Sequence, residues 1–256
     1  MVHGVWPVDP QADTLLAKSF ALLRDKWEEL PATRMERTRA PLLSSLSDDE
    51  LLCFWDRAHK DHTAGEGFRA RGWYELLYTE QLRGKRVLDY GCGLAFDTIH
   101  FAQNGAKVTF ADLAESNVDA VKRLARLKGL CGSEFLYMED LSSLNALQGN
   151  YDFVLCLGSM INAPLWVLQA EAAAILPHVP IGGRWIEFGY PKTRWIREGQ
   201  VPFHRWGEKT DGGAPWMEWH DVAKIRQYLA PAQFEVVLDV EFHSSDFNWT
   251  DLIRRA

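Results

Sequence analysis

Two patterns of hydrophobic positions divide the chain into an N-terminal and a C-terminal part. In the first part the apolar residues recur in steps of three and four, which places them on one face of a helix. One such segment covers residues 13–30, a second begins at Ser47, and a third runs over residues 68–82. Ser47 and Glu50 form a capping box, which marks the start of the second helix. The pattern therefore predicts a helical N-terminal cap over residues 1–82.

In the second part, short apolar runs alternate with helical patterns. The runs that predict strands cover residues 87–90, 108–111, 135–138, 153–157 and 185–188. Helical patterns lie between several of these runs, at residues 96–104, 115–128 and 165–176. This alternation is typical of parallel strands joined by crossover helices, with both faces of the sheet covered.

The end of the chain follows a different pattern. The apolar runs 235–242 and 247–253 are separated by a connection too short for a crossover helix, so they are expected to pair antiparallel. The sequence thus predicts an α/β fold over residues 83–256. Its centre is a doubly wound, mostly parallel sheet of seven strands with an antiparallel C-terminal hairpin.

Residues 190–219 interrupt the alternation and are rich in Trp, Arg, Gly and Pro, which predicts an insertion or lid. Four of the 11 tryptophans fall inside it: Trp195, Trp206, Trp216 and Trp219. An aromatic enclosure of this kind can exclude water and hold a flat or cationic substrate. Arginines in the same segment could instead clamp a carboxylate or phosphate.

Composition narrows the classes of partner. The net charge of −7, from 28 basic and 35 acidic residues, is opposite to that expected of a nucleic-acid binder. No apolar run is long enough to span a membrane, and the N-terminus does not resemble a secretory signal. The four cysteines lie far apart, without disulfide or zinc-ribbon spacing. These features predict a cytoplasmic protein that acts on a small molecule rather than on nucleic acid or a membrane.

The stretch from Val87 to Asp97 predicts a strand, a glycine turn and a helix in succession. Gly91 and Gly93 allow the backbone to pass close to a ligand, and the helix start offers free N–H groups. Asp112 ends the next strand, where a carboxylate can accept hydrogen bonds from ribose hydroxyls. This pattern predicts a pocket for a nucleotide or nucleoside.

Two cofactor classes fit such a pocket. The dinucleotide fingerprint requires a small residue at position 96, where this chain has the bulky Phe96. Asp89 would repel a pyrophosphate, but it suits a ligand with a cationic amino-acid end. The residues therefore favour the second kind of ligand over NAD.

The run V-L-D-Y-G-C-G at residues 87–93 resembles the first motif of the class I S-adenosylmethionine-dependent methyltransferases. The resemblance implies a Rossmann-like fold from residue 86 onward, with S-adenosyl-L-methionine as cofactor and S-adenosyl-L-homocysteine as product. Ala95 stands where the family usually has a third glycine. The cofactor contacts implied by the resemblance are Asp89, Gly91, Gly93, Asp112, Leu113, Asp140, Leu141 and Leu157.

Methyl transfer needs a base only when the nucleophile carries a proton that must leave. The candidate bases are His59, His62, His204, His220, Glu187 and Tyr190. Of these, His204 and Tyr190 are the predicted catalytic residues, and Arg205, Trp206 and Trp195 are the predicted substrate contacts. The pair His59 and His62 could also bind a metal, but no third ligand is recognisable, so a solvated helix end is expected and no metal is predicted.

The sequence therefore predicts methyl transfer to an oxygen or nitrogen atom of a small-molecule acceptor. Three alternatives remain open. The first is a methyltransferase acting on a protein, a peptide or RNA, the second is an NAD-dependent oxidoreductase, and the third is a cofactor-binding protein without catalysis.

Overall fold

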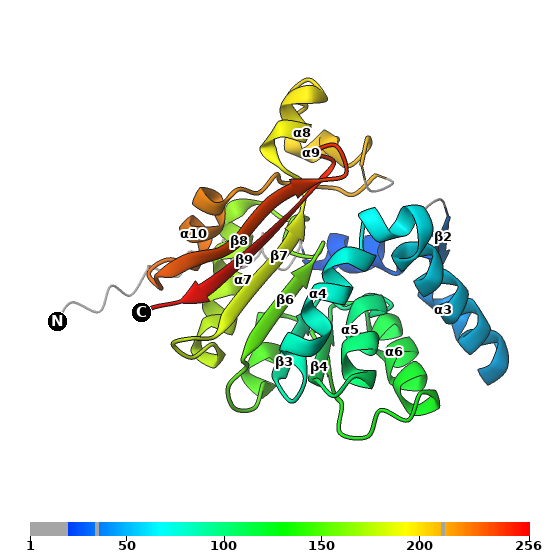
Figure 1. Ribbon diagram of the computed structural model, residues 1–256. Coiled ribbons are helices and arrows are strands. Elements are labelled where there is room, and N and C mark those ends of the chain that lie inside the picture. Colours follow the sequence, from blue (N-terminus) through cyan, green and yellow to red (C-terminus); the bar gives the residue numbers. More distant parts are fainter. Residues whose placement is uncertain (1–19, 34–35, 211–212) are drawn as a thin grey trace.

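A computed structural model describes residues 20–33, 36–210 and 213–256. Its centre is a seven-stranded sheet with the strand order β5-β4-β3-β6-β7-β9-β8 (Figure 1). Five strands are parallel: β3 (Arg86–Tyr90), β4 (Lys107–Asp112), β5 (Glu134–Tyr137), β6 (Phe153–Leu157) and β7 (Arg184–Gly189). β9 (Phe247–Arg254) lies between β7 and β8 (Phe234–Phe242) and runs antiparallel to both. The predicted fold class is confirmed, including the antiparallel hairpin.

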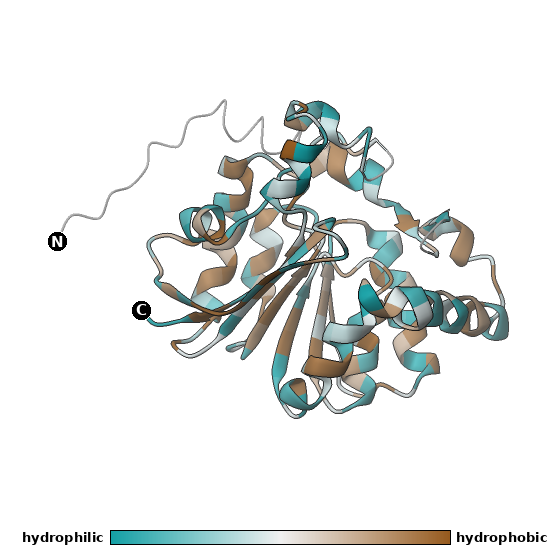
Figure 2. Ribbon diagram, turned by 45° about the horizontal axis from the view of Figure 1, so that its top comes forward, coloured by the Kyte–Doolittle hydropathy of each residue, from teal (hydrophilic) through white to brown (hydrophobic). Residues whose placement is uncertain are grey.

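Helices cover both faces of this sheet, as its parallel strands require. One hydrophobic core packs α4 (Gly72–Leu82), α5 (Phe96–Gln103) and α6 (Glu115–Leu127) against one face. A second core packs α7 (Leu165–Ile175) and α10 (Val222–Leu229) against the other. Figure 2 shows hydrophobic residues along the central strands that lie between these layers. The strand order reverses between β3 and β6, which is where open sheets of this type bind ligands.

The N-terminal part is mainly helical and shares the first core with the sheet. α3 (Asp48–Thr63) begins at the predicted capping box, where the Glu50 carboxylate accepts the Ser47 N–H at 2.7 Å. Of the first predicted helix, residues 20–27 are helical and residues 13–19 lie outside the described residues. No described helix is long and apolar enough to cross a bilayer.

Three short elements in this part were missed by the sequence analysis: the hairpin of β1 (Glu29–Pro31) and β2 (Arg37–Arg39), and α2 (Ala40–Leu43). Each has three or four residues. Such a length is below one period of a helical pattern and gives no clear alternation, so periodicity could not reveal them.

The apolar face predicted for residues 68–82 included Leu76 and Leu77, and at these two positions of α4 it is wrong. Leu76 and Leu77 are 72% and 45% exposed, whereas Tyr74 and Tyr78 are buried. The Tyr78 hydroxyl donates to the Asp251 carboxylate of β9 at 2.5 Å, and Arg184 of β7 also pairs with Asp251. The helix therefore packs through phenol groups whose hydroxyls have buried partners, and hydropathy alone favours leucine over such residues.

Residues 190–219 contain α8 (Lys192–Arg197) and α9 (Phe203–Trp206), which lie above the β8–β9 turn at the top of Figure 1. They form a small core of their own, together with Ile161. Thr193 donates to Glu241 at 2.8 Å, and Arg197 donates to the Ser244 carbonyl at 2.7 Å. These contacts fasten the segment to the tip of the C-terminal hairpin.

Candidate active site

A cavity of about 600 Å³ opens at the carboxyl ends of β3, β4, β6 and β7. Its volume is in the range of small-molecule sites, and it lies at the reversal of strand order. Six of the eight predicted cofactor residues line it: Asp89, Gly91, Gly93, Asp112, Leu113 and Leu157. The structure thus brings these six residues together in one cavity.

The glycine turn after β3 has a backbone conformation that favours glycine. Gly91 has a φ of +76°, and a Cβ there would collide with the Ser159 side chain from the loop after β6. Ala95 precedes α5 with a φ of +51°, the left-handed region that disfavours residues with a Cβ. The position that the family fills with a third glycine therefore has the conformation of a glycine, although this chain has alanine there.

Asp112 is held in place by three protein donors. Its Oδ2 accepts the Gly93 N–H at 2.8 Å, and its Oδ1 accepts the Ala114 N–H at 2.9 Å and the Asn117 amide at 3.1 Å. A carboxylate offers about four acceptor positions, so one remains for a ligand hydroxyl. Burial raises the pKa of Asp112, while the N–H groups of Ala114 and Gly93 counteract the shift.

Asp89 lies buried on β3 and accepts a hydrogen bond from the Thr98 hydroxyl of α5. Burial raises the pKa of Asp89 to about 7. The Thr98 hydrogen bond opposes the shift, and the neighbouring Asp97 and Asp112 add to it. A cationic ligand group beside Asp89 would favour the ionised carboxylate.

Sequence reasoning missed a charged pair in the cavity lining, Arg71 and Asp97. Arg71 Nη1 lies 2.8 Å from Asp97 Oδ2, and the guanidinium carbon is 5.3 Å from the ring centre of Phe188. Asp97 lies in the first turn of α5, directly after the glycine turn. A charged residue at this helix start could have indicated from the sequence that Asp97 belongs to the site. Arg71 lies in an irregular connection and gave no such signal.

Asp140 and Leu141 are absent from the cavity lining, which includes Met138 instead. The exposed Asp140 carboxylate accepts the Ser142 N–H at 2.8 Å and caps a short 3₁₀ helix, η2 (Leu141–Ala146). The structure therefore gives Asp140 a capping role, because an Asp before a polar helical turn is a favourable cap.

Tyr190 is the predicted catalytic residue that the cavity contains, and it packs against Phe247. The other predicted residues of the lid do not line the cavity. His204 and Arg205 are exposed, and Arg205 faces Glu208 at 3.4 Å. The indole N–H groups of Trp206 and Trp195 donate within the lid, to Glu198 at 2.6 Å and to the Val201 carbonyl at 2.8 Å. The aromatic rings bury one another instead of facing a ligand.

Two further candidate bases are buried outside the cavity. Glu187 Oε1 accepts the Trp185 indole N–H and the Tyr228 hydroxyl, each at 2.6 Å. Burial raises the pKa of Glu187 to about 8 and lowers the pKa of His220 to about 3. Both residues contribute to the packing behind β7, and neither is in reach of a ligand in the cavity.

The remaining pair, His59 and His62, does not form a solvated helix end, so that expectation is wrong. His62 is buried and lines the cavity, with its ring 4.9 Å from that of Phe96. The His59 ring stacks on Trp55 at 4.8 Å and does not line the cavity.

Comparison with known proteins supports the family suggested by the glycine turn. Residues 87–178 match the family model described as a methyltransferase domain. The chain is 38% identical over 114 residues to a ubiquinone biosynthesis O-methyltransferase of Bordetella avium, covering 42% of this chain and 43% of that protein. It is 34% identical over 105 residues to a magnesium-protoporphyrin O-methyltransferase of Synechocystis, covering 41% and 43%. The matches span less than half the length of these relatives.

Solved structures share the fold. The magnesium protoporphyrin IX methyltransferase of Synechocystis with bound SAH matches with a TM-score of 0.55 at 24% identity, over 72% of this chain and 81% of that one. An S-adenosylmethionine-dependent methyltransferase of Clostridium acetobutylicum matches with a TM-score of 0.56 at 14% identity, over 80% and 100%. The fold is Rossmann-like, and the cavity lies where open sheets of this type bind ligands. Residues 87–178 are thus similar to a methyltransferase domain, and the solved methyltransferases share the fold of the chain.

Proposed function

We propose that this chain uses S-adenosyl-L-methionine to methylate an oxygen atom of a small-molecule acceptor, with S-adenosyl-L-homocysteine as product. The observation that carries the proposal is the cavity in which Asp89, the glycine turn and Asp112 face one space. The names of the relatives, which include O-methyltransferases of two biosynthetic pathways, support oxygen as the acceptor atom.

The residues present fit this cofactor. The ligand would supply an electrophilic methyl group on a sulfonium sulfur. Asp89 offers a carboxylate for the cationic amino group, and Asp112 has one acceptor position left for a ribose hydroxyl. Leu113, Met138 and Leu157 offer apolar contacts in the same cavity. A pyrophosphate would meet the Asp89 carboxylate, which disfavours NAD.

The N-terminal part closes this end of the cavity. Arg24 donates to the Leu113 carbonyl at 3.0 Å. The Asn117 amide donates both to Asp112 Oδ1 and, at 2.9 Å, to the Trp27 carbonyl. One side chain thus bonds to both the Asp112 carboxylate and the N-terminal helical segment. We therefore propose that the cap predicted over residues 1–82 covers the cofactor end through its described residues, 20–33 and 36–82.

The opposite end of the cavity is the proposed acceptor site. Its wall includes the aromatic side chains of Phe188, Tyr190 and Phe247. This lining suits a flat, mostly apolar molecule, and Tyr190 offers a hydroxyl to the acceptor. A shared cavity of about 600 Å³ favours a small acceptor over a protein or RNA, in agreement with the net charge of −7. A cytoplasmic location remains part of the proposal.

Calorimetric titration tests the cofactor assignment. The wild-type chain is expected to bind S-adenosylmethionine and S-adenosylhomocysteine and not to bind NAD. Transfer of a labelled methyl group to a panel of hydroxylated aromatic compounds then tests the reaction. Preferential binding of NAD would overturn the cofactor assignment, and methylation of amines but not of hydroxyl groups would overturn the assignment of oxygen.

A further inference from the structure

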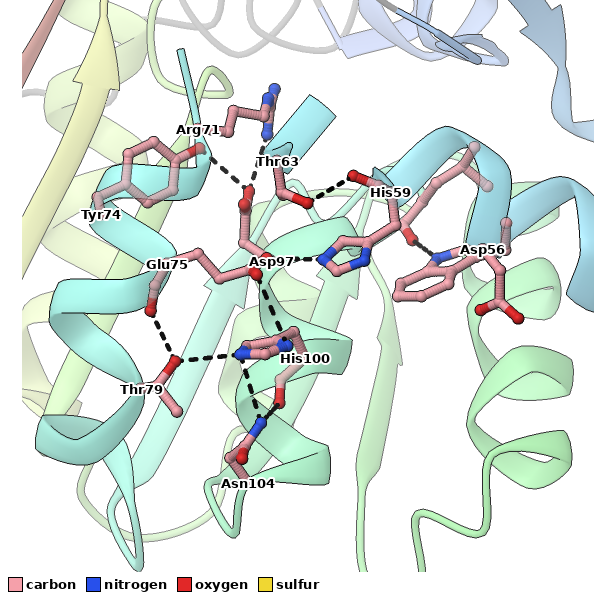
Figure 3. Close-up of polar contacts among 12 residues, drawn as sticks. Asp56, His59, Thr63, Arg71, Tyr74, Glu75, Thr79, Asp97, His100 and Asn104 are labelled. Carbon is pink, nitrogen blue, oxygen red and sulfur yellow. Dashed lines mark hydrogen bonds and ion pairs between the residues drawn. The ribbon is translucent and has the colours of Figure 1, made fainter. Parts of the chain in front are cut away.

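Outside the active-site cavity, three helices bring together three side chains with metal-binding atoms (Figure 3). These are His59 of α3, Glu75 of α4 and His100 of α5. His59 Nε2 lies 2.7 Å from Glu75 Oε2, and His100 Nδ1 lies 3.6 Å from Glu75 Oε1. One nitrogen or oxygen atom from each residue lies within 4.8 Å of the other two. The Glu75 side chain is only 10% exposed, so this carboxylate is buried beside two imidazoles.

The proton on His100 can be assigned from its neighbours. The Thr79 hydroxyl donates to the Glu75 carbonyl at 2.6 Å, so its proton is already used. The same oxygen lies 3.1 Å from His100 Nε2 and can meet it only as an acceptor, which places the imidazole proton on Nε2. The Asn104 amide N–H, 3.3 Å from this nitrogen, donates instead to the His100 carbonyl at 2.9 Å. In the neutral ring the lone pair of Nδ1 therefore faces the Glu75 carboxylate, an arrangement that a cation between them would stabilise.

We propose that His59, Glu75 and His100 bind a divalent transition metal, with Zn²⁺ as the best match. Two imidazole nitrogens and one carboxylate oxygen are a known three-ligand set for Zn²⁺, with bond lengths of about 2.0–2.2 Å and water at the fourth position. The hydrogen bond from His100 Nε2 to Thr79 is the second contact that a metal-binding histidine normally makes. Ligands of a tetrahedral site lie about 3.3 Å apart. When the ion binds, the widest pair of ligand atoms would therefore close by up to about 1.5 Å, whereas His59 Nε2 and Glu75 Oε2, now 2.7 Å apart, would separate slightly.

A neighbouring pocket offers the ion a way in from the surface and room for a water molecule as the fourth ligand. A surface pocket of about 380 Å³ is lined by Glu75, Thr79 and His100, among other residues. It can admit a hydrated cation and leave room for one water molecule. On the opposite side the Trp55 ring stacks on His59 and provides an apolar wall.

The position of the site indicates a structural role. The metal would fasten α3 and α4 of the N-terminal part to α5, the helix that begins at the glycine turn. Within α5, Asp97 and Thr98 contact Arg71 and Asp89, which line the active-site cavity. The ion would therefore stabilise the packing of the cap against the cofactor end. The proposal does not depend on methyl transfer.

The test uses the full chain after treatment with a chelator and dialysis. Calorimetry with Zn²⁺ is expected to show one ion per chain, and a Zn²⁺ concentration about 100 times the Kd is expected to raise Tm by about 5–10 °C. Co²⁺ at the same site is expected to give the visible absorption of a tetrahedral complex. Absence of one-to-one binding, or binding without a rise in Tm, would overturn the proposal.

Variants locate the site. Thr79→Val is expected to lower Zn²⁺ affinity about 10–100-fold, and Thr79→Ser, which keeps the hydroxyl, to restore it. His59→Ala, His100→Ala and Glu75→Gln are expected to lower affinity further. His178→Ala, which removes a histidine elsewhere on the protein, is the matched control and is expected to leave affinity unchanged. Equal losses for His178→Ala and His59→Ala would contradict the assignment, as would full affinity in Thr79→Val.

Discussion

The two ends of the active-site cavity are built in different ways. The cofactor end comes mostly from one stretch, residues 89–113, in which two strands and a glycine turn fix the positions of Asp89 and Asp112. The proposed acceptor end is assembled from segments far apart in the chain, and its wall includes Arg71, Phe188, Tyr190 and Phe247. A local motif can therefore reveal the first end, whereas the second exists only through tertiary packing.

The largest expected effect is on kcat, and it distinguishes a catalytic role for Tyr190 at the acceptor end from one for His204 in the lid. If Tyr190 removes the acceptor proton, Tyr190→Phe should lower kcat by about 10²–10⁴-fold. His204→Ala should change kcat less than twofold, because His204 is exposed and does not line the cavity. Steady-state kinetics with an identified acceptor measures both, and the affinity for S-adenosylhomocysteine should stay constant. The reverse pattern, with His204→Ala inactive, would return the catalytic role to the lid.

At the cofactor end, Asp112→Ala should weaken S-adenosylhomocysteine binding about 100-fold. The variant loses a charge-assisted hydrogen bond to the ligand, worth roughly 1.5–3 kcal/mol, and the contact that positions Gly93. Asp140→Ala is the matched control, because this carboxylate caps η2 outside the cavity. Calorimetry should show its Kd within twofold of the wild type. A loss in Asp140→Ala as large as in Asp112→Ala would place Asp140 at the ligand.

The pH dependence of binding sharpens the role of Asp89. Burial raises the pKa of this carboxyl to about 7, with Asp97 and Asp112 adding to the shift and Thr98 and Arg71 opposing it. A cationic amino group on the ligand lowers the pKa in the complex, so binding releases a proton. The association constant should therefore be highest above pH 7 and fall by up to tenfold per unit below it.

The ligand amino group has a pKa of about 7.7–8.0, so it stays charged over the range from pH 7 down to 5.5 and does not cause this change. Calorimetry at four or five pH values measures the profile. Asp89→Asn should bind more weakly and show a flat profile in the same range. A flat profile in the wild type would exclude Asp89 as the partner of the amino group.

The smallest expected effect concerns the turn itself. Ala95→Gly relieves the left-handed backbone of an alanine, about 1 kcal/mol, but adds the entropic cost of glycine, about 0.5–1 kcal/mol. The free energy of unfolding in urea should therefore change by no more than about 0.5 kcal/mol. Gly91→Ala should instead be clearly destabilising, because its Cβ meets Ser159. Equal effects at the two positions would show that the turn tolerates a Cβ throughout.

The same contrast explains how much of the molecule the sequence could predict. The parallel strands appear as short apolar runs because both of their faces are covered, and the capping box at Ser47 is a local hydrogen-bonding unit. The substrate contacts predicted in the lid do not line the cavity. The sequence could not reveal this, because the aromatic side chains of Trp206 and Trp195 can pack within the lid as well as against a substrate. Arg71 lay within the helical pattern of residues 68–82, but that pattern could not place it in the cavity, because its position there depends on how α4 packs against α5.

The cluster of His59, Glu75 and His100 shows the limit most clearly. A search for neighbouring ligands in the sequence finds His59 with His62, but His62 lines the active-site cavity and is not part of the cluster. The other two members of the cluster come from separate helices, and only the packing of those helices brings them to His59.

The interior place of β9 has a consequence for the synthesis of the protein. β9 follows every other strand in the chain, yet it lies between β7 and β8 and carries the buried Asp251 that Tyr78 of α4 contacts. While residues 247–254 are still inside the ribosome, one edge of β7 is unpaired and the Tyr78 hydroxyl of α4 lacks Asp251 as its hydrogen-bond acceptor. Such an edge can pair with other nascent chains. The sheet can close only after β9 emerges, so the interval before that is when this protein most needs protection from aggregation.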